Sequence, residues 1–129
     1  MIEHTNEEDP NECCGMLAIS HGEVVGHYRI TNTERSPYRY KMDAREHMMT
    51  MHQIEDAGNE VAYYHSHTHS PAYPSATDIR LVTFAESFYL LISPHEYDSE
   101  QKVISKTPQI RAFLITDGNV AEESVVTSD

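Results

Sequence analysis

The chain has 129 residues, a length that fits one folded domain around a single hydrophobic core. Its 21 acidic and 9 basic residues give a net charge of −12, which repels phosphate groups and therefore argues against nucleic acid or a membrane as partner. No apolar stretch is long enough to cross a bilayer, and the first residues carry no basic or hydrophobic leader pattern, so we expect a cytoplasmic protein.

The first third of the chain predicts a short helix followed by a hairpin. Residues 2–9 fit the last turns of a helix that ends before Pro10. Strands are predicted over residues 13–20 and 23–31, with His-Gly as the turn between them. The adjacent Cys13 and Cys14 have poor geometry for a disulfide, and we expect them to be small core residues.

The middle of the chain predicts a short strand over residues 38–42 and a helix over residues 43–57. Asp43 is a candidate N-cap, and Gly58 follows the helix as a stop signal. Helical spacing of the apolar residues predicts that the methionines at 48, 49 and 51 fill the core together with Ile54.

The last half of the chain predicts further strands around one helix. In chain order these are a strand over residues 61–66, a proline-containing loop, a helix from Ser75 to about Ala85, and strands over 88–93, 102–106, 110–116 and near Val120. This alternation predicts a single-domain α/β sandwich in which helices flank a central mixed β-sheet.

One constellation of polar residues follows the strand at 61–66. His65 and His67 are separated by one residue, and Ser75 and Asp78 follow at fixed distances. A His-x-His pair alone is expected about 0.6 times by chance in this composition, whereas the four residues at these spacings are expected roughly 0.003 times. Ser75 and Asp78 also fit a helix capping box, which is compatible with a role in a site.

The spacing of these residues predicts a metal centre. Two histidines two residues apart at a strand end project to one face, and Asp78 returns from the first turn of the next helix. Two nitrogens and one carboxylate oxygen can bind zinc and leave its fourth position open for water, as catalytic zinc sites do.

The pattern of His65, His67, Ser75 and Asp78 resembles the JAMM motif of the JAB/MPN metallopeptidase family. The resemblance implies a deaminase-like α/β sandwich over the whole chain, although the Pro-Cys-x-x-Cys ligand pair of zinc deaminases is missing. It also implies that His65, His67 and Asp78 are zinc ligands, that Glu12 in "PNECCGMLA" is the general acid/base, and that the Ser75 hydroxyl stabilises the oxyanion. Family members usually have a strand and a longer first helix before the proline, and we expect that part to be missing here.

Four segments narrow the resemblance to the bacterial Mec-type branch. They read "TNTERSPYRYKMD", "YHSHT", "AYPSATDI" and "ITDGNV". Hydrolases of that branch release cysteine from the C-terminus of a ubiquitin-like sulfur-carrier protein, so the resemblance implies such a carrier as substrate. The segment from Arg35 to Met42 is our candidate sheet edge for the carrier's extended tail.

Several alternatives remain open at the level of the sequence. His69 continues the alternation of His65 and His67 and is a rival ligand to Asp78. The chain could also be a non-catalytic MPN-type scaffold, or a histidine-rich metal-binding domain for which Glu12 is irrelevant. The tyrosines at 38, 40 and 73 fit either a substrate groove or the core. Surface or packing roles are expected for the scattered histidines His4, His21, His27, His47, His52 and His95.

Overall fold

The computed structural model describes the chain except for residues 39, 81–86, 101, 117 and 124–129. Its elements, in chain order, are α1 (Ile2–Glu8), β1 (Cys14–Ser20), β2 (Glu23–Ile30), α2 (Ala44–Asp56), β3 (Glu60–Ser66), α3 (Ala76–Arg80), β4 (Phe88–Ser93), β5 (Glu96–Tyr97), β6 (Val103–Ser105), β7 (Gln109–Thr116) and β8 (Asn119–Glu123). No helix in the described ranges has the length and apolar character needed to span a bilayer.

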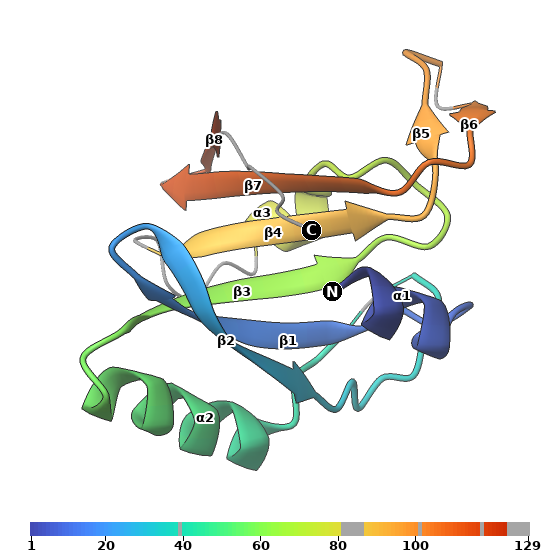
Figure 1. Cartoon of the computed structure of the whole chain (residues 1–129). Coiled ribbons are helices and arrows are strands. Elements are labelled where there is room, and N and C mark those ends of the chain that lie inside the picture. The colour runs from blue at the N-terminus through green and yellow to red at the C-terminus, as the bar shows by residue number, and fades with distance from the viewer. Residues whose placement is uncertain (39, 81–86, 101, 117, 124–129) are drawn as a thin grey trace.

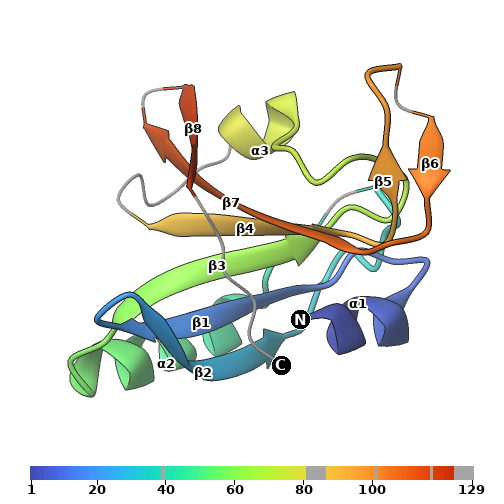
Figure 2. The same ribbon diagram turned by 45° about the horizontal axis from the view of Figure 1, so that its top comes forward.

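A six-stranded mixed sheet forms the centre of the molecule, with the strand order β2-β1-β3-β4-β7-β8. Its neighbouring strands are antiparallel except β3 and β4, which run parallel and are connected through α3. Figures 1 and 2 show α1 and α3 on opposite sides of this sheet. The predicted α/β architecture, a central mixed sheet flanked by helices, is therefore confirmed.

Local sequence signals explain the best-predicted elements. The turn between β1 and β2 places His21 at φ 50° and Gly22 at φ 79°, the left-handed conformations that a two-residue hairpin needs. Asp43 caps α2, because its carboxylate accepts the Glu46 N–H at 3.0 Å. Gly58 follows the helix at φ 80°, where a residue with a side chain is disfavoured.

Alternating side chains of the sheet build core on both of its faces. One face carries the cluster Cys13, Leu17, Ala62, Tyr64, Leu90, Ile92 and Ala112. On the opposite face lie Cys14, Met16, Ala18, Ile30, Ile54, Tyr63 and Tyr89 near α2, and Ala72, Leu91, Phe113 and Ile115 near α3. The core role predicted for the cysteines is confirmed, since Cys13 and Cys14 are both fully buried.

The strand predicted over residues 38–42 is wrong for the described part of that segment. Only a single bridge between Asn32 and Met42 forms there. The Lys41 N–H, which a strand would pair with a neighbour, instead donates to the Asn32 side-chain oxygen at 3.0 Å. The described residues between 32 and 42 therefore form a loop beside the sheet.

The core role predicted for two of the methionines is also wrong. Met48 and Met49 are exposed on α2, with 59% and 60% of their surface accessible, whereas Met51 packs partly against the core. The covered stripe of the helix runs through His47, Thr50, Met51 and Ile54. Met48 follows His47 and Met49 precedes Thr50, so each is displaced by one position from the stripe and is rotated about 100° away from it.

The segment after β4 contains a strand that the sequence did not indicate. β5, two residues long, pairs antiparallel with β6 and forms a separate small sheet beyond the end of β4 (Figure 1). The strands β4, β6 and β7 begin and end within one residue of their predicted bounds, and β8 contains Val120, near which the last strand was predicted. The helix predicted from Ser75 to Ala85 is observed over Ala76–Arg80, and residues 81–86 lie outside the described part.

Candidate active site

Two of the predicted ligands lie at the carboxyl end of β3. The Ser66 N–H donates to the Cys13 carbonyl at 3.0 Å, and the His67 N–H donates to the Ile92 carbonyl at 2.8 Å. The backbone therefore stays extended between its neighbours past the last residue of β3. As a result, His65 and His67 project to the same side of the sheet, as the alternation in the sequence predicts.

Asp78 reaches the histidines from the first turn of α3. The Ser75 hydroxyl oxygen accepts the Asp78 N–H at 3.0 Å, and an Asp78 carboxylate oxygen accepts the Ser75 N–H at 2.9 Å. This reciprocal pair is a capping box, so the N-cap position predicted for Ser75 is confirmed. The cap also fixes the direction of the Asp78 carboxylate.

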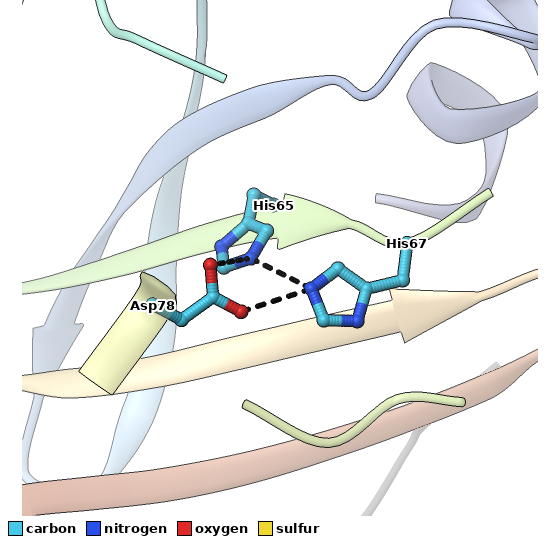
Figure 3. A group of neighbouring side chains, drawn as sticks. All are labelled: His65, His67 and Asp78. Carbon is cyan, nitrogen blue, oxygen red and sulfur yellow. Dashed lines mark hydrogen bonds and ion pairs between the residues drawn. The ribbon is translucent and has the colours of Figure 1, made fainter. Parts of the chain in front are cut away.

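The three side chains converge on one point, as Figure 3 shows. The two Nε2 atoms of His65 and His67 lie 3.2 Å apart, and they lie 3.3 and 2.9 Å from Asp78 Oδ1 and Oδ2 respectively. Two ligand atoms of a tetrahedral zinc site are separated by about 3.3 Å when zinc–ligand bonds are about 2.0 Å long. The observed separations fit that geometry, so the group can hold a metal ion.

Neighbouring groups orient the two imidazoles. His67 Nδ1 lies 2.9 Å from the Pro71 carbonyl oxygen, which accepts its N–H and leaves the Nε2 lone pair directed at the centre. The Tyr40 ring stacks on His65 with 4.3 Å between ring centroids. The Pro71 contact could not be predicted from the sequence, because every residue type carries a backbone carbonyl that can accept such a bond.

The electrostatics of the metal-free group favour the protonation states that a metal requires at Asp78 and His65 but not at His67. At His67, burial opposes protonation but is outweighed by the hydrogen bond and charge of Asp78, which raise the pKa of this imidazole. Burial opposes ionisation of Asp78, but hydrogen bonds from His65 and His67 outweigh it and hold the pKa of this carboxyl well below its usual range. Burial is the main cause that lowers the pKa of His65 and favours its neutral form. Metal ligands need an ionised carboxylate and imidazoles with a free lone pair.

Glu12 lies just before β1 and is buried, with 6% of its surface exposed. Its N–H donates to the Ser36 carbonyl at 2.8 Å, and its own carbonyl accepts from the Asn32 side chain at 2.9 Å. Burial is the largest effect that raises the pKa of Glu12 to about 7, with smaller and opposing influences of His67 and Asp78. The carboxyl group is therefore electrostatically coupled to the metal-binding group without being one of its members.

The rival ligand His69 lies outside the convergent group. Its Nδ1 is 2.9 Å from the Thr68 hydroxyl, and its ring contacts Tyr38 with 5.5 Å between centroids. Of the three tyrosines considered for a groove, Tyr38 thus contacts His69, and Tyr40 stacks on His65 in β3. Tyr73 is 48% exposed and instead places its ring against the buried Phe113.

Three scattered histidines serve packing, as predicted. His4 Nδ1 and His27 Nε2 each lie 2.7 Å from the buried hydroxyl of Tyr64, and His47 Nε2 lies 2.9 Å from the hydroxyl of Tyr63. Burial raises the pKa of Cys14 to about 12 and also raises the pKa of Cys13, so both thiols stay protonated at neutral pH and are poor nucleophiles.

Comparison with known proteins gives the same family as the motif. Residues 1–105 match the family model described as prokaryotic homologs of the JAB domain. A relative from Mycobacterium tuberculosis, named CysO-cysteine peptidase, is 37% identical over 97% of this chain and 82% of its own length. A desampylase from Haloferax volcanii is 30% identical over 78% of this chain and 83% of its own length.

Two solved structures share the fold. A solution structure of a Desulfitobacterium hafniense protein superposes with a TM-score of 0.77 at 31% identity, covering 98% of this chain and 84% of that one. A Salinibacter ruber protein at 24% identity gives a TM-score of 0.61 over 99% of this chain and 84% of that one, which supports the fold alone. The chain therefore belongs to the prokaryotic homologs of the JAB domain and is a hydrolase of the peptidase type.

Proposed function

We propose that this protein is a zinc-dependent hydrolase that cleaves an amide bond at the C-terminus of a ubiquitin-like sulfur-carrier protein and releases cysteine. The observation that carries the proposal is the convergence of His65, His67 and Asp78 at metal-ligand separations. His67 and Asp78 also interact electrostatically with the buried carboxyl group of Glu12. In this proposal the three convergent residues bind the metal and Glu12 moves the proton.

Zinc held by His65, His67 and Asp78 would supply Lewis acidity and lower the pKa of a bound water to near 7. Glu12 accepts a proton from the water as its oxygen adds to the scissile carbonyl carbon. When the carbon–nitrogen bond then breaks, Glu12 returns that proton to the leaving nitrogen, so that the acid/base is regenerated. A carboxyl group with a pKa of about 7 is matched to both transfers.

Ser75 is proposed to donate a hydrogen bond to the carbonyl oxygen as negative charge develops on it. Its oxygen already accepts the Asp78 N–H, which leaves the hydroxyl proton available as a donor. The cap on α3 already holds this hydroxyl beside the Asp78 carboxylate, so no free energy is needed to reorganise the donor when the reaction occurs.

The names of the relatives support the substrate class. One relative is named for a cysteine-loaded carrier, and the other is named for removal of a protein modifier. The carrier's extended tail is proposed to lie along the loop of residues 32–42, where Tyr38 is 75% exposed and Tyr40 stacks on His65. We expect the tail to contact side chains and backbone of this loop. It cannot add to a sheet edge there, because no strand forms in the described part of this segment.

The test is mass spectrometry on the zinc-loaded protein incubated with a carrier protein that bears one additional C-terminal cysteine. The expected result is loss of that one residue. Glu12→Gln should retain zinc and lose hydrolysis, because the amide keeps the size of the side chain but cannot carry the proton. Glu8→Gln, an exposed neighbour in α1, is the control and should remain active.

The outcomes separate the competing functions. A scaffold binds the carrier without cleaving it, and a metal-binding domain loses nothing in the Glu12→Gln variant. Full activity of Glu12→Gln would exclude the proposed mechanism. Cleavage of a lysine isopeptide but not of the cysteine-extended carrier would place the protein closer in activity to the desampylase.

A further inference from the structure

The backbone of Glu12, the proposed acid/base, is bonded to the loop of residues 32–42. The pairing of β1 with β2 and β3 begins at Cys14, two residues after Glu12. The Glu12 N–H donates instead to the Ser36 carbonyl at 2.8 Å, and the Glu12 carbonyl accepts from Nδ2 of Asn32 at 2.9 Å. The direction of this buried side chain therefore depends on a segment that begins 20 positions later in the chain.

The side-chain amide of Asn32 connects Glu12 to two further points of the loop. Its Oδ1 accepts the N–H groups of Glu34 and Lys41, at 3.0 Å in each case, while its Nδ2 donates to Glu12. These partners fix the orientation of the amide, because only its oxygen can accept and only its nitrogen can donate. An aspartate at this position could accept from the two N–H groups but could not, when ionised, donate to the Glu12 carbonyl.

The part of the loop that Asn32 closes also carries the second anchor of Glu12. Ser36, whose carbonyl accepts the Glu12 N–H, lies in the chain between Glu34 and Lys41, the two residues bonded to the amide oxygen. Removal of the amide would therefore break one backbone bond of Glu12 directly and loosen the segment that makes the other.

We propose that Asn32 is a positioning residue for the hydrolysis and holds Glu12 in the orientation that proton transfer at the metal-binding group requires. The inference rests on the proposed function, since it assigns a support to the acid/base of that reaction. His67 and Asp78 interact electrostatically with the Glu12 carboxyl group, so the position of that group relative to them matters. Asn32 is not a member of the metal-binding group, and its loss should affect proton transfer without affecting the metal.

The first experiment measures kcat and KM of zinc-loaded Asn32→Asp and Asn32→Ala on the cysteine-extended carrier. A misplacement of about 1 Å in an active site can cost about 100-fold in rate, so we expect kcat to fall by about 10- to 100-fold in both variants. Asn32→Asp keeps the acceptor for Glu34 and Lys41 and should leave KM unchanged. A loss of kcat common to both variants cannot come from the charge that the aspartate adds.

Two comparison variants separate this role from closure of the loop and from the chemical change itself. The Thr33 hydroxyl donates to the Lys41 carbonyl at 3.1 Å, so Thr33→Val removes another bond that closes the loop, and its effect should fall on KM more than on kcat. Asn119→Asp makes the same substitution at an exposed position of β8, at the opposite edge of the sheet from β2, and should change neither quantity.

A second measurement does not depend on turnover. In metal-free protein with ¹³C-labelled glutamate carboxyl groups, Glu12→Gln identifies the NMR signal of Glu12. Asn32→Ala should shift that signal at constant pH, and Asn119→Asp should not. Zinc content and zinc affinity of Asn32→Ala should equal those of the wild type, because the three ligands are intact.

The outcomes distinguish this inference from the proposed function. An active wild type together with unchanged kcat in both Asn32 variants would overturn the inference and leave the proposed function standing. An equal loss of kcat in Thr33→Val, or an unmoved Glu12 signal in Asn32→Ala, would show that Asn32 serves only the structure of the loop. A wild-type protein that does not cleave the carrier would overturn the proposed function, whatever the NMR signal shows.

Discussion

The burial of Glu12, which tunes its pKa for the proposed catalytic role, lowers the stability of the folded protein at neutral and alkaline pH. Burial raises its pKa from about 4.5 to about 7, so the folded protein holds a proton there that the unfolded chain releases. Stability is therefore lost as pH rises from about 4.5 to 7 and remains reduced above that range. Glu12→Gln should stabilise the metal-free protein at pH 8 by about 1 to 3 kcal/mol and have little effect at pH 4.

Urea denaturation at the two pH values measures this effect. Glu55→Gln changes an exposed glutamate on α2 in the same way and should leave stability within about 0.5 kcal/mol at either pH. A Glu12→Gln variant that is less stable than the wild type at pH 8 would show that the carboxylate is well solvated or paired in the native protein.

Ser75 is predicted to combine a structural and a catalytic role, and Asp43 offers a control with the structural role alone. Both residues accept a backbone N–H from the third residue after them, at 3.0 Å in each case. Ser75→Ala and Asp43→Ala should each cost about 1 kcal/mol of stability. Only Ser75→Ala should also lower kcat by about 100-fold, because loss of an oxyanion donor costs about 3 kcal/mol in the transition state.

Melting temperatures and single-turnover rates of the two variants, both loaded with zinc, provide the comparison. Equal losses of stability together with unchanged rates would reduce Ser75 to a helix cap. A rate loss in Asp43→Ala would show that the stability of distant helices controls turnover.

At the scale of elements, α1 is attached to the sheet through a buried histidine. His4 is 4% exposed, and its Nδ1 lies 2.7 Å from the Tyr64 hydroxyl on β3. Burial, followed by the charge of Arg29, lowers the pKa of His4 to about 4. The unfolded chain therefore takes up a proton near pH 6.5, whereas the folded chain takes it up only near pH 4.

The stability contributed by this arrangement is complete above about pH 6.5 and is lost as pH falls towards 4. The loss amounts to about 3 kcal/mol. His4→Gln should be less stable than the wild type at pH 7.5, and the difference should shrink by pH 4.5, as urea denaturation can measure. A difference that is independent of pH would mean that His4 contributes packing without a linked proton.

At the scale of the whole molecule, the group of His65, His67 and Asp78 joins β3 to the helix α3 that follows it. A metal that binds only the folded state stabilises the protein by about 4 kcal/mol at 1,000 times its dissociation constant. We expect one zinc per chain and a rise in melting temperature that a chelator reverses. His67→Ala should abolish both, whereas His69→Ala should preserve both.

Metal analysis and thermal melts with and without zinc check this prediction. Loss of zinc in His69→Ala but not in Asp78→Asn would restore the three-histidine alternative. Two zinc ions per wild-type chain would point to the histidine-rich metal-binding function.

The sequence predicted most helices and strands because their signals are local. The cap at Asp43 and the turn at Gly22 act within a few residues, and both appear in the structure. The prediction of a strand at residues 38–42 failed because a side chain distant in the sequence competes for the backbone. Residues 38–42 alternate like a strand, yet the Lys41 N–H is taken by the side chain of Asn32, nine positions earlier.

The convergence of His65, His67 and Asp78 was also predictable from the sequence, since their spacing reflects a strand end and a helix start that are both local features. Only the tertiary structure decided the environment of these residues. The burial of Glu12 and its bond to the Asn32 side chain depend on segments far apart in the chain, and the Pro71 carbonyl behind His67 depends on the path of the loop. Residue type and spacing determine which donor atoms are available, whereas packing of the whole chain determines their solvation, and with it their pKa values and their access to substrate.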